Sequence, residues 1–367
     1  MEELSLCALE RLEEDGALAC TLRYAHLRLA TLNDFCGICD LKHVFGSMLR
    51  PTVCTRALCA HQLSAFGEML VGATSLATHA EVLDLLVATT SLAAKSPRAE
   101  DVLAPRPQLD ASGTPGAIAD VRAVLLKFPT FERINTAALD STESGMKAID
   151  TLLEKCDKRA SQLLRWIIAS NPAHLVSIPE PNRLQRLGTR HQFVMLSAPP
   201  EKQKRFDQLK QQHGSRFAWH GSRPENWHSI LRMGLRNASG TKLQLNGAAY
   251  GNGIYLSTSV SYSENYSNMA RPRQPPAAAK AAAALSSAAA DSQNAFLVGR
   301  ELRLIALCEV AQDPLITKNS NIWVAPNEDA VVTRFLFAFP AGVGGATRAR
   351  GVFVEDSLRS SLLFAGV

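Results

Sequence analysis

In the first half of the chain, apolar residues recur at helical spacing between charged positions. The clearest case is 81–94, where valine and leucine return every three or four residues and predict an amphipathic helix. Similar patterns predict one or two helices within 4–32 and further helices at 118–128 and 152–170. The stretch 96–116 carries four prolines and is expected to be a linker or an irregular loop.

From about Pro179 the pattern changes to short runs of β-branched and aromatic residues, which indicate strands. The expected strands are 191–197, 216–219, 253–256, 302–310, 321–324 and 331–339. The helices expected between them are 199–212, 224–233 and 259–269. Residues 271–290 are rich in Pro, then in Ala and Ser, and are expected to form a surface insertion.

Composition narrows the class of protein. The chain has 367 residues and is 46% hydrophobic, which permits two or three domains with a sizeable core. A net charge of +5 is only mildly basic and gives no clear sign of nucleic-acid binding, because such proteins concentrate charge on one face. The start is acidic rather than signal-like, and no apolar run is long enough to span a membrane. We therefore expect a cytoplasmic protein, with the nucleus as the alternative.

The cysteines include two close pairs near the N-terminus. Cys36 and Cys39 are followed after fourteen residues by Cys54 and Cys59. In a reducing compartment, a metal or free thiols are favoured over disulfides. Four thiolates can form a tetrahedral structural zinc site, although the second pair is C-x4-C rather than C-x2-C. Free cysteines in a helical segment are the alternative.

Three elements of the second half could close on a small aromatic ring. They are His220-Gly221-Ser222, then Tyr255 after a glycine-rich turn, then a segment with Ser263 and Tyr266. Two tyrosine faces can stack on a ring. A glycine permits close backbone approach, and its N–H and C=O suit a carboxamide. The serine hydroxyl can add a third hydrogen bond, and the histidine can bond a sugar hydroxyl.

The order of these elements resembles the poly(ADP-ribose) polymerase family, the ADP-ribosyltransferases that split NAD. The resemblance also includes 217–222, 226–231, 234–235 and 304–310, and it covers roughly 192–339. Residues 45–59 resemble the cysteine-rich region of one mono-ADP-ribosylating branch, commonly counted as members six and eight.

The resemblance implies specific roles. His220, Tyr255 and a residue of the last strand, near Phe335, take the catalytic triad positions. NAD is expected to be bound by the following residues: His220, Gly221, Ser222, Arg236, Tyr255, Ser263 and Tyr266. Within this set, Gly221, Ser263 and Tyr266 would hold nicotinamide, and Arg236 would reach the adenosine side.

The last strand departs from the family pattern. Chain-elongating members carry a glutamate there, whereas 330–339 contains no acidic residue. Glu328 and Asp329 precede the strand, where the register is expected to point them away from the site. An apolar side chain cannot act as a general base. The expected reaction is therefore transfer of one ADP-ribose to a protein side chain, of another protein or of the chain itself, with release of nicotinamide. The alternative is a catalytically weak or inactive module that binds NAD or ADP-ribose and acts as an interaction protein.

The resemblance also completes the expected architecture. The fold class is α+β, with a split antiparallel β-sheet ADP-ribosyltransferase domain behind a mainly helical, cysteine-rich N-terminal region. The expected boundaries are 1–100 for that region, 101–180 for a linker and helical segment, and 181–367 for the catalytic domain with an insertion at 271–300.

Overall fold

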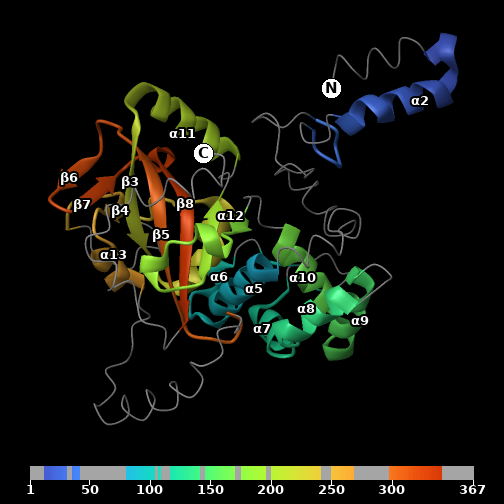
Figure 1. Ribbon diagram of the computed structural model, residues 1–367, viewed down its shortest axis with the longest axis horizontal. Helices are drawn as coiled ribbons and strands as arrows, with labels where there is room; N and C mark the ends of the chain where they lie inside the picture. The colour runs from blue at the N-terminus through green and yellow to red at the C-terminus, as the bar shows by residue number, and fades with distance from the viewer. Residues whose placement is uncertain are drawn as a thin grey trace. The chain divides into compact units, whose positions relative to one another are not determined.

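The computed structural model describes residues 12–30, 35–41, 80–103, 106–107, 109, 116–140, 145–169, 175–195, 200–240, 249–267 and 297–340 (Figure 1). Two compact units make up the chain, Met1–Gly72 and Ala73–Val367. Domain boundaries at 100 and 180 stay predictions, since one compact unit can hold several domains. Most of the predicted 271–300 insertion lies outside the described residues. None of the described helices has both the length and the apolar character needed to cross a bilayer.

The described part of the first unit is helix α2 (Leu12–Ala30) and the turn 35–41. Arg28 joins the two. Its guanidinium carbon lies 3.5 Å from the centroid of the Phe35 ring. Its Nη2 donates to Asp40 Oδ2 at 2.8 Å. These contacts hold the turn that contains Cys36 and Cys39 against the end of the helix.

The helices at the start of the second unit are α5 (Ala80–Lys95), α6 (Ala99–Val102), α7 (Ile118–Leu126), α8 (Phe131–Asp140), α9 (Gly145–Cys156) and α10 (Ala160–Ala169). Helix α5 is the central one and contacts α7, α10 and α12. Its leucines and valines are mostly buried, each contributing about 1.5–3 kcal/mol. The hydroxyls of Thr89 and Thr90 bond to carbonyls one turn back, at 2.9 and 2.7 Å, so burial leaves them satisfied.

Two predictions for this region need correction. The helix predicted at 152–170 is the end of α9 followed by α10. Asp157 breaks it, because its Oδ1 accepts the backbone N–H of Arg159 at 3.0 Å and forms a turn. The stretch 96–116, predicted to be irregular, contains the short helix α6.

A single antiparallel sheet follows. Its strands are β1 (Leu175–Ser177), β2 (His191–Met195), β3 (Ser215–Gly221), β4 (Ile254–Ser257), β5 (Leu302–Ala311), β6 (Thr317–Asn319), β7 (Ile322–Ala325) and β8 (Val331–Pro340). Helices α11 (Pro200–His213), α12 (Trp227–Met233) and α13 (Val260–Ser267) connect them, with short 3₁₀ turns η2 (Glu180–Asn182), η3 (Gln185–Leu187), η4 (Pro224–Asn226) and η5 (Glu328–Ala330). The predicted α+β class with an antiparallel sheet and a helical N-terminal region is confirmed.

The strand order is β1-β2-β8-β5-β3-β4-β7-β6, and the sheet is split between β3 and β4. Strand β3 pairs with β5 over its whole length, from Ser215 to Gly221. It pairs with β4 through one position alone, Trp219 opposite Ser257. The two strands diverge from that point, which leaves room between them for a ligand.

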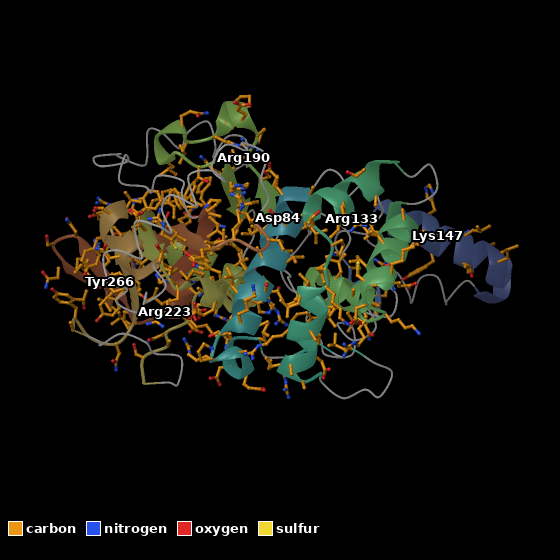
Figure 2. All side chains as sticks on the ribbon, turned by 90° about the horizontal axis from the view of Figure 1, so that it is seen from below. Asp84, Arg133, Lys147, Arg190, Arg223 and Tyr266 are labelled. Carbon is orange, nitrogen blue, oxygen red and sulfur yellow. The ribbon has the colours of Figure 1, made fainter. Side chains whose placement is uncertain are left out.

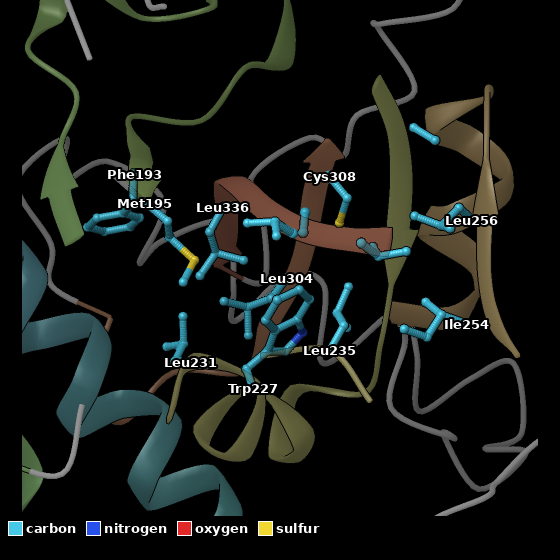
Figure 3. Close-up of a cluster of buried hydrophobic side chains, with 14 of the residues drawn as sticks. Phe193, Met195, Trp227, Leu231, Leu235, Ile254, Leu256, Leu304, Cys308 and Leu336 are labelled. Carbon is cyan, nitrogen blue, oxygen red and sulfur yellow. The ribbon is translucent and has the colours of Figure 1, made fainter. Parts of the chain in front are cut away.

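Each face of the sheet has its own apolar cluster. The first cluster includes Trp227, Leu304 and Leu336 together with residues of α5 (Figure 3). The second cluster is built around Trp219, Phe335 and Phe337. Side chains alternate between faces along a strand, so the two clusters take alternate residues of β3 and most of β5 and β8. Helix α13 packs against β3 and β5 and contributes Val260 to the second cluster.

Helix α5 is also fixed to the sheet by a buried carboxylate. Asp84, labelled on α5 in Figure 2, accepts the backbone N–H groups of Leu297 and Val298, just before β5. Burial of this polar group without contact to solvent is tolerated because backbone donors satisfy it. The helical region and the sheet are therefore joined by specific hydrogen bonds as well as by apolar packing.

Candidate active site

A cleft of about 310 Å³ opens where β3 and β4 diverge. Its volume lies in the range of small-ligand sites. Its walls come from β3, β4, α12, α13 and the loops around them, with two residues from α6 and the turn before it. The lining includes His220, Gly221, Ser222, Arg236, Tyr255, Ser263 and Tyr266. The cleft thus brings together every residue that the sequence predicted to bind NAD.

His220 is held in one orientation at the end of β3. Its Nδ1 lies 2.9 Å from the carbonyl oxygen of Tyr255 on β4. A carbonyl can only accept, so Nδ1 carries the proton and Nε2 is the free acceptor of the neutral ring. Burial lowers the pKa of His220 from 6.5, and the bond to Tyr255 opposes this only in part. The ring is therefore neutral at pH 7, and it spans the split between the two strands.

Gly221 is required by a close approach. A Cβ on Gly221 would lie 1.8 Å from the carbonyl oxygen of Ser263, a backbone atom that cannot rotate away. The buried Ser263 hydroxyl donates to the carbonyl of Trp219 at 3.1 Å, which ties α13 to β3. Ser222 is fixed next to it, because its hydroxyl accepts from Asn226 Nδ2 at 3.0 Å and its carbonyl from Trp227 Nε1 at 3.2 Å. The strand end and the helix thus form one rigid wall.

Four tyrosines line the cleft beside this wall: Tyr250, Tyr255, Tyr262 and Tyr266. The Tyr255 hydroxyl donates to the carbonyl of Gly251 at 2.8 Å and accepts the backbone N–H of Tyr250 at 2.9 Å, so the glycine turn fixes the ring. Tyr266 is 39% exposed, and its hydroxyl lies 3.2 Å from that of Tyr262. These rings offer flat apolar faces to a ligand in the cleft.

Phe335, predicted for the third triad position, does not line this cleft. It is fully buried in the second apolar cluster with Trp219, and its ring stacks on Phe337 with centroids 6.4 Å apart. Trp219 and His220 are neighbours on β3 and point to opposite faces. Phe335 therefore lies on the face of the sheet away from His220.

Strand register identifies the β8 residue on the same face as His220. His220 pairs with Ala306 on β5, and Ala306 pairs with Leu336 on β8. Leu336 is fully buried and belongs to the first cluster. Leu336, like Phe335, does not line the cleft, so the third triad position stays a prediction; the side chain is apolar in either case.

The two acidic residues before β8 are engaged elsewhere. Glu328 Oε2 accepts the backbone N–H of Asn237 at 3.0 Å, and Asp329 Oδ2 accepts from Arg205 at 2.6 Å. Neither lines the cleft. The expectation that they point away from the site is consistent with these contacts.

Some lining residues were missed by the sequence prediction. Tyr262 lies one helical turn before Tyr266, and this i, i+4 spacing could have revealed it. Arg223 directly follows Ser222 and lines the cleft, as does Arg98, which precedes α6 (Arg223 is labelled in Figure 2). None of the described side chains that line the cleft is acidic. Arg98 has no signal in the local sequence that links it to residues 122 positions away.

The described residues give no support to a metal site. Cys36 is buried and Cys39 half-buried, while Cys54 and Cys59 lie outside the described residues. In the part of the chain that the structure describes, no three His, Cys, Asp or Glu side chains gather where they could hold a metal. The zinc site is therefore not established.

Known proteins resemble the chain both in the cleft region and along most of its length. Residues 193–311 match the poly(ADP-ribose) polymerase catalytic domain. The mouse protein mono-ADP-ribosyltransferase PARP8 is 40% identical over 363 residues, covering 94% of this chain and 42% of the relative. The human PARP8 is 40% identical over 359 residues, covering 93% of this chain and 42% of the relative. Poly [ADP-ribose] polymerase 1 of Xenopus laevis is 42% identical over 62 residues, which are 17% of this chain and 6% of the relative.

The chain thus spans well under half the length of the two PARP8 relatives that it matches. Within that span, the match to the catalytic domain includes β3, β4, α13 and β5, the elements around the cleft. Together with the cleft geometry, these comparisons show that residues 193–311 are a poly(ADP-ribose) polymerase catalytic domain.

Proposed function

We propose that this chain transfers one ADP-ribose from NAD to a protein side chain, which can be its own, and releases nicotinamide. One observation carries the proposal: the contact of Gly221 with Ser263 places a rigid backbone wall in a cleft lined by four tyrosines, beside a fixed neutral histidine. A flat carboxamide ring fits such a slot. The name of the PARP8 relatives as mono-ADP-ribosyltransferases supports the same reaction.

The roles follow from the atoms that each residue presents. Tyr255 and Tyr266 offer ring faces for stacking on nicotinamide, and Gly221 offers backbone groups for its carboxamide. The free Nε2 of His220 accepts a hydrogen bond from a ribose hydroxyl and fixes the sugar. When the bond between the ribose C1′ and the nicotinamide nitrogen breaks, its electron pair leaves with nicotinamide. The acceptor side chain then supplies the pair for the new bond to C1′.

The limit to a single unit rests on strand β8. Chain elongation needs a group that activates a hydroxyl of the first ADP-ribose. The β8 residue that the strand pairing places level with His220, through Ala306 of β5, is Leu336. Leucine can neither accept a proton nor orient a hydroxyl. An acceptor that is already ionised needs no such base, so transfer to a protein remains chemically open.

The rival is a module that binds NAD or ADP-ribose without transferring it. The same apolar β8 position is the observation in its favour, because it removes a polar contact to the substrate ribose. The two functions differ in whether a covalent product forms. A binding module would bind NAD in competition with nicotinamide, and no protein would become labelled.

The test is incubation of the purified chain with labelled NAD, followed by a denaturing gel. We expect a discrete labelled band that is lost in His220→Ala and Tyr255→Ala. The matched control is His213→Ala, an exposed histidine at the end of α11 that does not line the cleft, which should label normally. A high-molecular-weight ladder would show polymer formation and refute the argument from Leu336. Binding without label would favour the rival.

A structural zinc site at Cys36, Cys39, Cys54 and Cys59 stays a separate proposal. It is supported by the spacing of the two cysteine pairs in the sequence. We expect elemental analysis to find about one zinc per chain. The double variant Cys36→Ser, Cys39→Ser should contain none. Substitution of the buried Cys308 by Ser is the control and should leave the metal content unchanged. A metal-free wild-type chain would exclude the site.

A further inference from the structure

Residues outside the segment that matches the catalytic domain also line the cleft. Arg98 and Val102 line it, although they lie in the helical region, far outside residues 193–311. Arg98 immediately precedes α6, and Val102 is the last residue of that helix. The helical region therefore contributes a charged side chain to the proposed NAD site.

Arg98 is held there by contacts on both sides. Its backbone N–H donates to Ser96 Oγ at 3.1 Å. Arg122 of α7 fixes the same turn by donating to the carbonyls of Ala94 and Ser96, the latter at 3.2 Å. Helix α5, from which this turn emerges, packs closely on η4. The backbone of Arg98 is thus positioned before any ligand arrives.

The side chain of Arg98 points toward the motif that carries His220. Its Nη1 lies 3.5 Å from Asn226 Oδ1, and Asn226 Nδ2 donates to Ser222 Oγ at 3.0 Å. One asparagine thus separates Arg98 from the residues assigned to nicotinamide and its ribose. In NAD, the group joined to that ribose is the diphosphate.

The charges of the cleft suit this group. Its lining contains Arg98, Arg223 and Arg236, and none of its described side chains is acidic. A diphosphate carries two negative charges and accepts several hydrogen bonds, and arginine presents a planar set of donors suited to phosphate oxygens. On the basis of the proposed function, we infer that Arg98 binds the diphosphate of NAD, so that the helical region completes the donor site.

This inference makes a selective prediction about ligands. Arg98→Ala should weaken the binding of NAD and of ADP-ribose about tenfold, the loss expected for one charge-assisted hydrogen bond in a partly buried site. It should leave the binding of nicotinamide unchanged, because nicotinamide has no phosphate. Arg98→Lys keeps the charge but loses the fork of donors, and should lie between the two.

The experiment is titration of the full chain with NAD, ADP-ribose and nicotinamide, alongside thermal unfolding of each variant. Arg106→Ala is the matched control, because Arg106 pairs with Glu100 and does not line the cleft. This variant should bind all three ligands as the wild type does. Equal NAD affinity in Arg98→Ala and wild type would refute the inference while leaving the proposed function intact. Equal loss of all three ligands in Arg98→Ala would show that Arg98 only supports the fold. A wild-type chain that binds no NAD would overturn both proposals.

Discussion

Gly221→Ala is expected to lower the affinity for NAD and the rate of ADP-ribosyl transfer by about a hundredfold or more. The added methyl carbon would lie 1.8 Å from the Ser263 carbonyl oxygen and 2.7 Å from its carbonyl carbon. These are backbone atoms of α13, so the clash can be relieved only by moving the helix away from β3. That movement would break the bond between Ser263 and Trp219 and displace Tyr266. Labelled transfer and NAD titration measure the effect.

The control for this variant is another glycine beside open space. A methyl carbon on Gly240 would have no atom within 4 Å, although the positive φ of +75° makes alanine strained there by about 1–2 kcal/mol. Gly240→Ala should therefore lower stability slightly and leave transfer near the wild-type rate. Gly221 is absent from the residues with positive φ, so its effect would be steric rather than conformational. Normal activity of a folded Gly221→Ala protein would refute the close contact between β3 and α13.

Glu309→Gln is expected to lower the free energy of unfolding by about 3 kcal/mol while leaving NAD affinity unchanged. Glu309 lies on β5, and its carboxylate is 2.8 Å from the Arg334 guanidinium, 2.8 Å from Lys210 Nζ and 2.6 Å from Ser215 Oγ. The side chains of Glu309 and Arg334 are only 3% and 6% exposed. Removing the negative charge leaves a buried guanidinium without its counter-charge. Urea unfolding measures the loss.

The same pair predicts an acid-dependent loss of stability. Burial by itself would raise the pKa of Glu309, but Arg334, Lys210 and Ser215 together hold it below its ordinary 4.5. A carboxylate with a lowered pKa stabilises the fold fully above its unfolded value, and this contribution is lost as the pH falls through the lower folded value. Wild type should therefore lose stability below about pH 4.5 more steeply than Glu309→Gln.

An exposed glutamate provides the matched comparison. Glu100 pairs with Arg106 on the surface, where its side chain is 68% exposed. Glu100→Gln should cost less than about 1 kcal/mol, because solvent screens the pair. If the two variants lost a similar free energy of unfolding, the buried pair would contribute no more to stability than the exposed pair, and the prediction would be wrong.

The sequence placed the local parts of the site well, because each lies within a short motif. His220-Gly221-Ser222 ends one strand, Tyr255 follows a glycine turn, and Ser263 and Tyr266 fall one turn apart on a helix. Strand and helix periods fix which side chains of such a segment share a face. All of these residues do line the cleft. Their roles toward NAD stay predictions until binding is measured.

The facing of the side chains on strand β8 depends on its register with β5. Strand β8 pairs Phe335 with Leu307 but Thr333 with Cys308, so Arg334 is an extra residue in the ladder. A bulge of this kind shifts the facing of every later side chain by one position, and the apolar run 331–339 gives no sign of it. Alternation alone could therefore not separate Phe335 from Leu336.

By itself, the sequence determined the class of fold, the resemblance of the second half to a catalytic domain, and the residues that surround the proposed nicotinamide slot, because these depend on short-range patterns. Only the tertiary structure decided that Leu336 shares the face of His220, since this depends on pairing across three strands. It also decided that Arg98 reaches the same cleft. That contact depends on how α5 packs against η4, and side-chain packing between distant segments leaves no periodic signal in the sequence.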